Sequence, residues 1–184
     1  MNRYLILIFI ALFFSCKEKQ ISPIEYINVL YYNGLFERTE AVGCHEIINM
    51  PIKNATSLFL EGGTRIPQEA YIIDTIITDK QVLHEVLNEL KLAKSTKNYS
   101  MDARMKCYIQ FTDGRIDSLC TNQFYTYGYY NGNPIMLTNK FAYLLRKHCG
   151  FYEWIGIDQM QYFDELNDST LEREKVKSHS GEEY

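Results

Sequence analysis

The segment Cys44-His45-Glu46 places three kinds of metal ligand in a row, which makes it the first candidate for chemistry in this sequence. Neighbouring residues of a strand point to opposite faces, so at most Cys44 and Glu46 would share one side. A metal site needs further ligands at a suitable spacing, and the sequence offers no second pair of them. The sequence therefore predicts no metal site and no cofactor.

Motifs for catalysis and nucleotide binding are missing from the sequence. It contains no Gly-x-Ser-x-Gly, no glycine-rich phosphate loop, no His-Glu-x-x-His and no calcium-loop pattern. A nucleophilic cysteine-histidine pair would depend on the fold to bring the two together, and it would be lost if the cysteines were oxidised. The net charge of −4 and the absence of a large basic cluster argue against nucleic acid as a partner. We therefore expect a protein that is not an enzyme.

The cysteines suggest disulfide bonds. Asp113-Gly114 stands between two alternating runs, which predicts a hairpin. With a two-residue turn, Cys107 and Cys120 lie directly opposite each other on the apolar face, close enough for a disulfide. Cys44–Cys149 is then the second bridge by elimination. The alternative is that Cys107 and Cys120 are two buried thiols side by side.

Tyr125, Tyr127 and Tyr129 alternate along one segment and would project from one face of a strand. One interpretation is an aromatic platform that binds a protein partner or a sugar, because tyrosine is enriched at binding surfaces. The other, which the sequence favours, is that tyrosine simply suits a half-buried sheet face.

The first sixteen residues have the layout of a secretory signal. Arg3 provides a positive start, residues 4–14 are apolar, and Ser15-Cys16 ends the run. In a helix the apolar part would reach roughly 16 Å, about half of the hydrocarbon core, so a permanent membrane span is not expected. Two interpretations of this layout are an ordinary cleaved signal and an uncleaved anchor, and the residues around Cys16 suggest a third.

A small residue directly before a cysteine, followed at once by polar residues, resembles the lipobox of bacterial lipoproteins, although Phe13 stands where that family usually has leucine. The resemblance covers residues 1–16 only. It implies cleavage before Cys16, acylation of its sulfur, and a lipid-anchored protein of the cell envelope that faces the periplasm or the cell surface.

The remaining 169 residues, with a net charge of −5, are enough for one domain. We expect a tether at 16–23, one globular domain at 24–166 and a disordered tail at 167–184, where apolar residues are few. Strand patterns are predicted at 24–32, 39–50, 70–78, 105–120, 125–130 and 151–157, and the strand at 70–78 is expected to be central because both of its faces are apolar. Helices are predicted after Thr78 and after Thr138 or Asn139, the second ending at Gly150.

Hairpins dominate this pattern, and strands and helices do not alternate regularly. The sequence therefore predicts an α+β fold: a mainly antiparallel sheet built from hairpins, with two helices packed on one face. With the anchor and the lack of catalytic motifs, this predicts a non-catalytic domain that binds another envelope protein, as an inhibitor, an immunity-type protector or an accessory subunit. The alternative is a module that uses the tyrosine face to bind a glycan or another small ligand.

Overall fold

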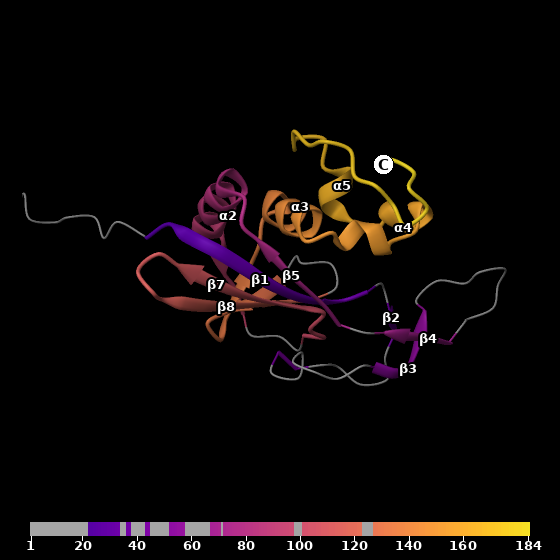
Figure 1. Ribbon diagram of the computed structural model, residues 1–184, viewed down its shortest axis with the longest axis horizontal. Coiled ribbons are helices and arrows are strands. Elements are labelled where there is room, and N and C mark those ends of the chain that lie inside the picture. The colour runs from indigo at the N-terminus through magenta and orange to yellow at the C-terminus, as the bar shows by residue number, and fades with distance from the viewer. Residues whose placement is uncertain are drawn as a thin grey trace, which may run out of the picture.

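The computed structural model describes residues 22–33, 36–37, 43–44, 52–57, 67–70, 72–97, 101–122 and 127–184. Its main feature is a seven-stranded antiparallel sheet in the order β5-β1-β7-β8-β9-β10-β6 (Figure 1). These strands are β1 (Ile24–Tyr32), β5 (Ile72–Ile77), β6 (Lys94–Ser95), β7 (Met105–Phe111), β8 (Ile116–Thr121), β9 (Tyr127–Tyr130) and β10 (Asn133–Met136). A separate three-stranded sheet contains β2 (Phe36–Glu37), β3 (Ile52–Ser57) and β4 (Pro67–Ala70).

The helices α2 (Lys80–Leu92) and α3 (Asn139–His148) lie on one face of the large sheet, so the predicted α+β fold is confirmed (Figure 1). The short helices η1 (Phe151–Trp154), α4 (Ile157–Met160) and α5 (Asp164–Asn167) follow α3. Apolar residues at helical spacing on α2 and α3 bury against alternate residues of the strands, as the 3.6- and two-residue periods require. The strand side of this core includes Val29, Tyr31, Cys107, Ile109 and Leu119.

The starts of both helices are fixed by side chains that accept hydrogen bonds from backbone N–H groups. Thr138 caps α3 as predicted, and its hydroxyl accepts from the N–H of Phe141. Gly150 follows α3 with φ +76°, a conformation that favours glycine. The cap of α2 is Asp79 rather than the predicted Thr78, and its carboxylate accepts from the N–H groups of Gln81 and Val82.

The predicted hairpin exists, but its register differs from the prediction by one residue. Phe111 N–H donates to Arg115 O, so the loop contains three residues and ends on Gly114 at φ +85°. Cys107 therefore pairs with Leu119, and Cys120 pairs with Lys106. Because a one-residue shift moves side chains to the other face, Cys107 and Cys120 lie on opposite sides of the sheet.

Two other strand predictions are corrected. The strand predicted at 70–78 is β5, which pairs only with β1 and lies at an edge of the described sheet rather than at its centre. The strand predicted at 151–157 is instead the 3₁₀-helix η1. Cys16, the signal segment and most of the strand predicted at 39–50 lie outside the described residues.

The expected disordered tail at 167–184 is also corrected, because this segment packs against the helices. Val176 is buried, and its N–H and C=O groups bond to the main chain of Tyr184. The Arg173 guanidinium donates to Leu166 O, and the Tyr143 hydroxyl bonds to the main chain of Glu174. The segment is held largely by polar bonds that its low apolar content does not reveal.

Arg146 is the main buried charge, although its place in the last turn of α3 predicts an ordinary surface cation. Its side chain is 0% exposed and forms an ion pair with the buried Glu165. The Tyr152 hydroxyl also donates to Glu165, at 2.8 Å. The guanidinium lies 4.4 Å from the centre of the Phe163 ring, which adds a cation–π contact to the ion pair.

Candidate binding face

The large sheet has one face without helices. We call it the helix-free face. Within the described residues, its side chains alternate along each strand with those of the core. They are Tyr26, Asn28 and Leu30 of β1, Ile72, Asp74 and Ile76 of β5, Lys106, Tyr108 and Gln110 of β7, Ile116, Ser118 and Cys120 of β8, Tyr127 and Tyr129 of β9, and Pro134 and Met136 of β10. The pairing aligns these side chains in rows across the sheet, and one row runs from Asp74 through Leu30 and Lys106 to Cys120 and Tyr129.

Exposed apolar side chains concentrate on the helix-free face. Six large apolar residues are exposed among the described residues, and four of them lie there: Ile76, Ile116, Tyr127 and Met136. The most exposed, Ile116, has 60% of its surface in contact with solvent. Single exposed apolar residues are ordinary, but their gathering on one face is typical of an interaction surface.

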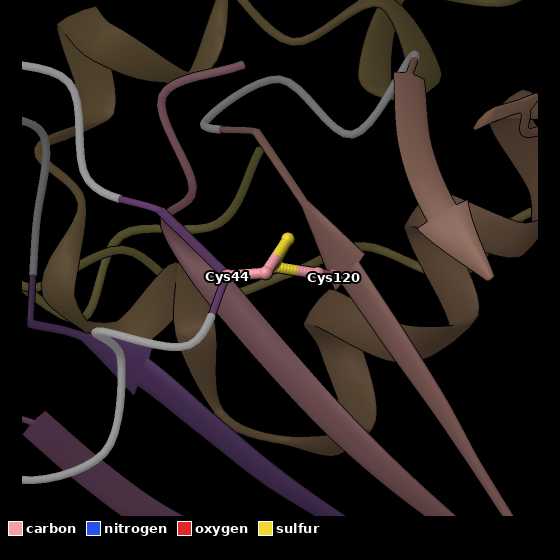
Figure 2. Close-up of a disulfide and its surroundings, with 2 residues drawn as sticks. All are labelled: Cys44 and Cys120. Atoms are coloured by element: carbon pink, nitrogen blue, oxygen red, sulfur yellow. A yellow bond between two sulfur atoms is a disulfide. The ribbon is translucent and has the colours of Figure 1, made fainter. Parts of the chain in front are cut away.

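A disulfide crosses this face. Cys44, which lies between β2 and β3 in the chain, is bonded to Cys120 of β8, and their Cα atoms are 5.8 Å apart (Figure 2). Cys120 is buried in a small apolar cluster with Tyr32 and Ala103, against which Cys44 packs. The bond therefore fixes residue 44 to the middle of the sheet.

Both predicted disulfides, Cys107–Cys120 and Cys44–Cys149, are wrong. Cys107 and Cys149 are free thiols buried in the core on the helix side, whereas the Cys44–Cys120 bond lies on the other side. Burial raises the pKa of the Cys149 thiol to about 12 and raises that of Cys107 well above its ordinary value. Since the thiolate is the reactive form, neither thiol is suited to nucleophilic chemistry.

A cavity of about 380 Å³ opens beside the disulfide. Its lining includes both cysteines of the bond, Lys106, Ser118 and Tyr129. The lining therefore combines one aromatic side chain, Tyr129, with one positively charged side chain, Lys106.

The tyrosines are placed partly as the sequence predicts. Tyr127 and Tyr129 share the helix-free face, and Tyr129 lines the cavity. Tyr125 lies outside the described residues. Tyr130 points to the core side, where its hydroxyl donates to the buried carboxylate of Asp117.

A second cleft, of about 590 Å³, lies between α2, α3 and residues 170–174. Two ion pairs lie in its lining: Lys140 pairs with Glu85 at 3.3 Å, and Lys147 pairs with Glu174. Burial lowers the pKa of His148, and the nearby Lys147 ammonium lowers it further. These ion pairs engage both lysines of the cleft with carboxylates of the same chain.

No three potential ligands among the described residues are grouped to hold a metal ion, and His45 and Glu46 lie outside them. No described helix combines the length and the apolar content needed to cross a membrane.

The exposed residues Ile76, Ile116 and Met136 are the part of this face that the sequence pattern does not reveal. With a two-residue turn, Ile116 falls on the same face as Cys107 and would be counted as core. The three-residue loop turns it outward, and Asp117 and Leu119 point inward instead. Comparison of the chain with protein-family models, curated proteins and solved structures finds no match, so the helix-free face is identified from its geometry alone.

Proposed function

We propose that this chain is a lipid-anchored protein of the bacterial cell envelope whose domain binds another envelope protein through the helix-free face. The role is non-catalytic: that of an inhibitor, an immunity-type protector or an accessory subunit. The observation that carries the binding role is the concentration of exposed apolar side chains on the sheet face that none of the described helices covers. Aromatic and aliphatic side chains of this kind form the centres of protein interfaces.

The anchor in this proposal rests on the sequence, and the disulfide agrees with it. Disulfides persist outside the cytoplasm, where a secretory signal would deliver the chain. Acyl chains on Cys16 would hold the protein at the membrane, at about 0.8 kcal/mol per buried CH₂ group. Cys16→Ser should therefore move the protein from the detergent phase to the aqueous phase or leave it as an unprocessed precursor. A wild-type mature protein in the aqueous phase would contradict the anchor.

The binding face is tested by comparing two lysine substitutions. Ile116 and Leu92 are 60% and 59% exposed, but Ile116 lies on the helix-free face and Leu92 ends α2. Burying an isoleucine contributes roughly 1.5–3 kcal/mol, so Ile116→Lys should weaken partner capture about tenfold or more. Leu92→Lys should leave it unchanged.

The measurement is chemical crosslinking of the full chain in the cell envelope, followed by recovery of the chain and quantification of the attached protein. Melting temperatures of the two variants check that both remain folded. A loss of equal size in both variants, or no loss in Ile116→Lys, would contradict binding through this face.

The cavity favours a second candidate, a module that binds a glycan or another small ligand. Tyr129 supplies a ring beside the polar groups of Lys106 and Ser118, a combination suited to a sugar. Under this alternative, glycan-array binding should occur in the wild type and disappear in Tyr127→Ala and Tyr129→Ala. Binding that survives both substitutions would place the ligand elsewhere.

A further inference from the structure

The two edges of the seven-stranded sheet differ in a way that bears on self-association. One edge is β6, which has only two residues, one of them Lys94. The other is β5, with six residues (Ile72–Ile77), and within the described chain it pairs with β1 alone. An edge strand exposes unpaired N–H and C=O groups, and proteins usually protect such edges with short strands, lysine or proline. The β6 edge has this protection.

The β5 edge lacks most of it. Its sequence, Ile-Ile-Asp-Thr-Ile-Ile, contains no lysine, arginine or proline, and Asp74 is its one charged residue. The side chain of Ile76 is 58% exposed. Helix α2 packs over β1, the neighbour of β5. Among the described residues, this edge therefore presents an apolar strand whose outer side pairs with no other strand.

We propose that a second copy of this chain pairs with β5 in the antiparallel sense and joins the two sheets into one. Two edges that meet in this way are related by a two-fold axis perpendicular to the sheet. The helices of both copies then lie on the same side, and paired residues must share a face. In such a register the two-fold axis passes between one residue and the same residue of the second copy. The two middle residues of β5 give two registers of this kind, one centred on Asp74 and one centred on Thr75.

Charge and side-chain pairing select Thr75. A centre at Asp74 would place two carboxylates directly opposite each other, which is destabilising. A centre at Thr75 pairs the two threonines and places Ile73 opposite Ile77 of the partner subunit. Both isoleucines belong to the helix side, where Ile77 is buried and Ile73 packs against the core. Asp74 then faces Ile76 of the partner subunit, and its carboxylate keeps the 2.6 Å hydrogen bond from Asn28.

The same register makes the interaction surface larger. Because both copies keep their helices on one side, their helix-free faces become one continuous surface. Ile76 of each copy lies at the junction, beside the exposed residues already described. The dimer is independent of the proposed partner protein, since it uses the backbone edge of β5 and not the middle of the face.

Cysteine crosslinking of the purified full-length chain in detergent tests this register. Directly paired residues have Cα atoms about 4.5–5.5 Å apart, within the reach of a disulfide. Thr75→Cys should therefore give a covalent dimer on oxidation. In Asp74→Cys the two cysteines lie diagonally, about 7–8 Å apart, and should crosslink several-fold less. The double variant Asp74→Cys with Ile76→Cys should recover the dimer.

Ile116→Cys is the control, because Ile116 is as exposed (60%) as Ile76 of β5 (58%) but lies on β8, an inner strand. Equal crosslinking of Ile116→Cys and Thr75→Cys, or no covalent dimer from any β5 variant, would overturn the proposal. Stronger crosslinking of Asp74→Cys than of Thr75→Cys would overturn the register. Ile116→Lys placed in the Thr75→Cys chain should leave the dimer intact, so failure of the dimer and failure of partner binding are separate results.

Discussion

Removal of the Cys44–Cys120 disulfide should produce the largest loss of stability of any substitution on the helix-free face. The two cysteines are 76 residues apart in the sequence. In the chain-entropy description, closing a loop of this length stabilises the folded state by about 4.5 kcal/mol. For a chain of this size, each kcal/mol corresponds to about 2–4 °C in melting temperature. The double substitution Cys44→Ala with Cys120→Ala should therefore lower the melting temperature by about 9–18 °C.

The assay is thermal unfolding of the full-length chain with and without a reducing agent. The reducing agent should lower the melting temperature of the wild type toward that of the double variant and should leave the double variant unchanged. Cys107→Ala with Cys149→Ala is the control: it removes two buried thiols but no covalent bond, so it should keep the sensitivity to reduction. Non-reducing peptide mapping should recover one linked peptide pair, containing Cys44 and Cys120. A wild-type chain that melts at the same temperature with and without the reducing agent would refute the reasoning.

Three further predictions concern the core and the C-terminal segment. Arg146→Ala should lower the unfolding free energy by about 3–5 kcal/mol, because it leaves Glu165 as an unpaired buried charge; if Glu165→Gln is added, chemical denaturation should show a loss smaller than the sum of the two single losses. Deletion of residues 171–184 should lower the melting temperature by at least about 4 °C, since burial of a valine such as Val176 contributes roughly 1.5 kcal/mol or more; an unchanged melting temperature would show that the segment does not dock. Burial and the Asp117 carboxylate raise the pKa of Tyr130 to about 12, above its ordinary value of 10.0. The contribution of Tyr130 to stability is therefore complete below pH 10 and is lost as the pH rises toward 12. Between pH 8 and 11, the melting temperature should fall more steeply with pH for the wild type than for Tyr130→Phe.

The features that the sequence predicts correctly depend on local signals. The cap and apolar spacing of α3 lie within a few residues of one another, and the Asp113-Gly114 signal places the β7–β8 hairpin correctly, although not its register. Asn131-Gly132 has positive φ at both residues, 47° and 78°, as the two-residue turn of the β9–β10 hairpin requires. The class of fold follows from these elements, because an antiparallel sheet with one apolar face needs helices to cover it.

The errors arise where the outcome depends on one residue of register or on distant contacts. Asp113-Gly114 fits both a two-residue loop and the end of a three-residue loop, and the sequence does not distinguish them. Arg146 is indistinguishable from a surface cation until η1 and α5 fold back with Tyr152 and Glu165. The docking of the segment after α5 is hidden in the same way, because backbone hydrogen bonds leave no mark on hydropathy.

The register of one hairpin decides both the disulfide and the candidate binding face. It sends Cys107 to the helix side and Cys120 to the helix-free face, and the sheet between them prevents a bond. Cys120 is then available to Cys44, and the same shift turns Ile116 outward and Asp117 inward. An oxidising compartment is needed for that bond, and export through the N-terminal signal would supply it. The export inferred from Cys16 and the surface formed around Cys120 are therefore linked, because a chain kept in the cytoplasm would lack the covalent bond that fixes residue 44 on the proposed binding face.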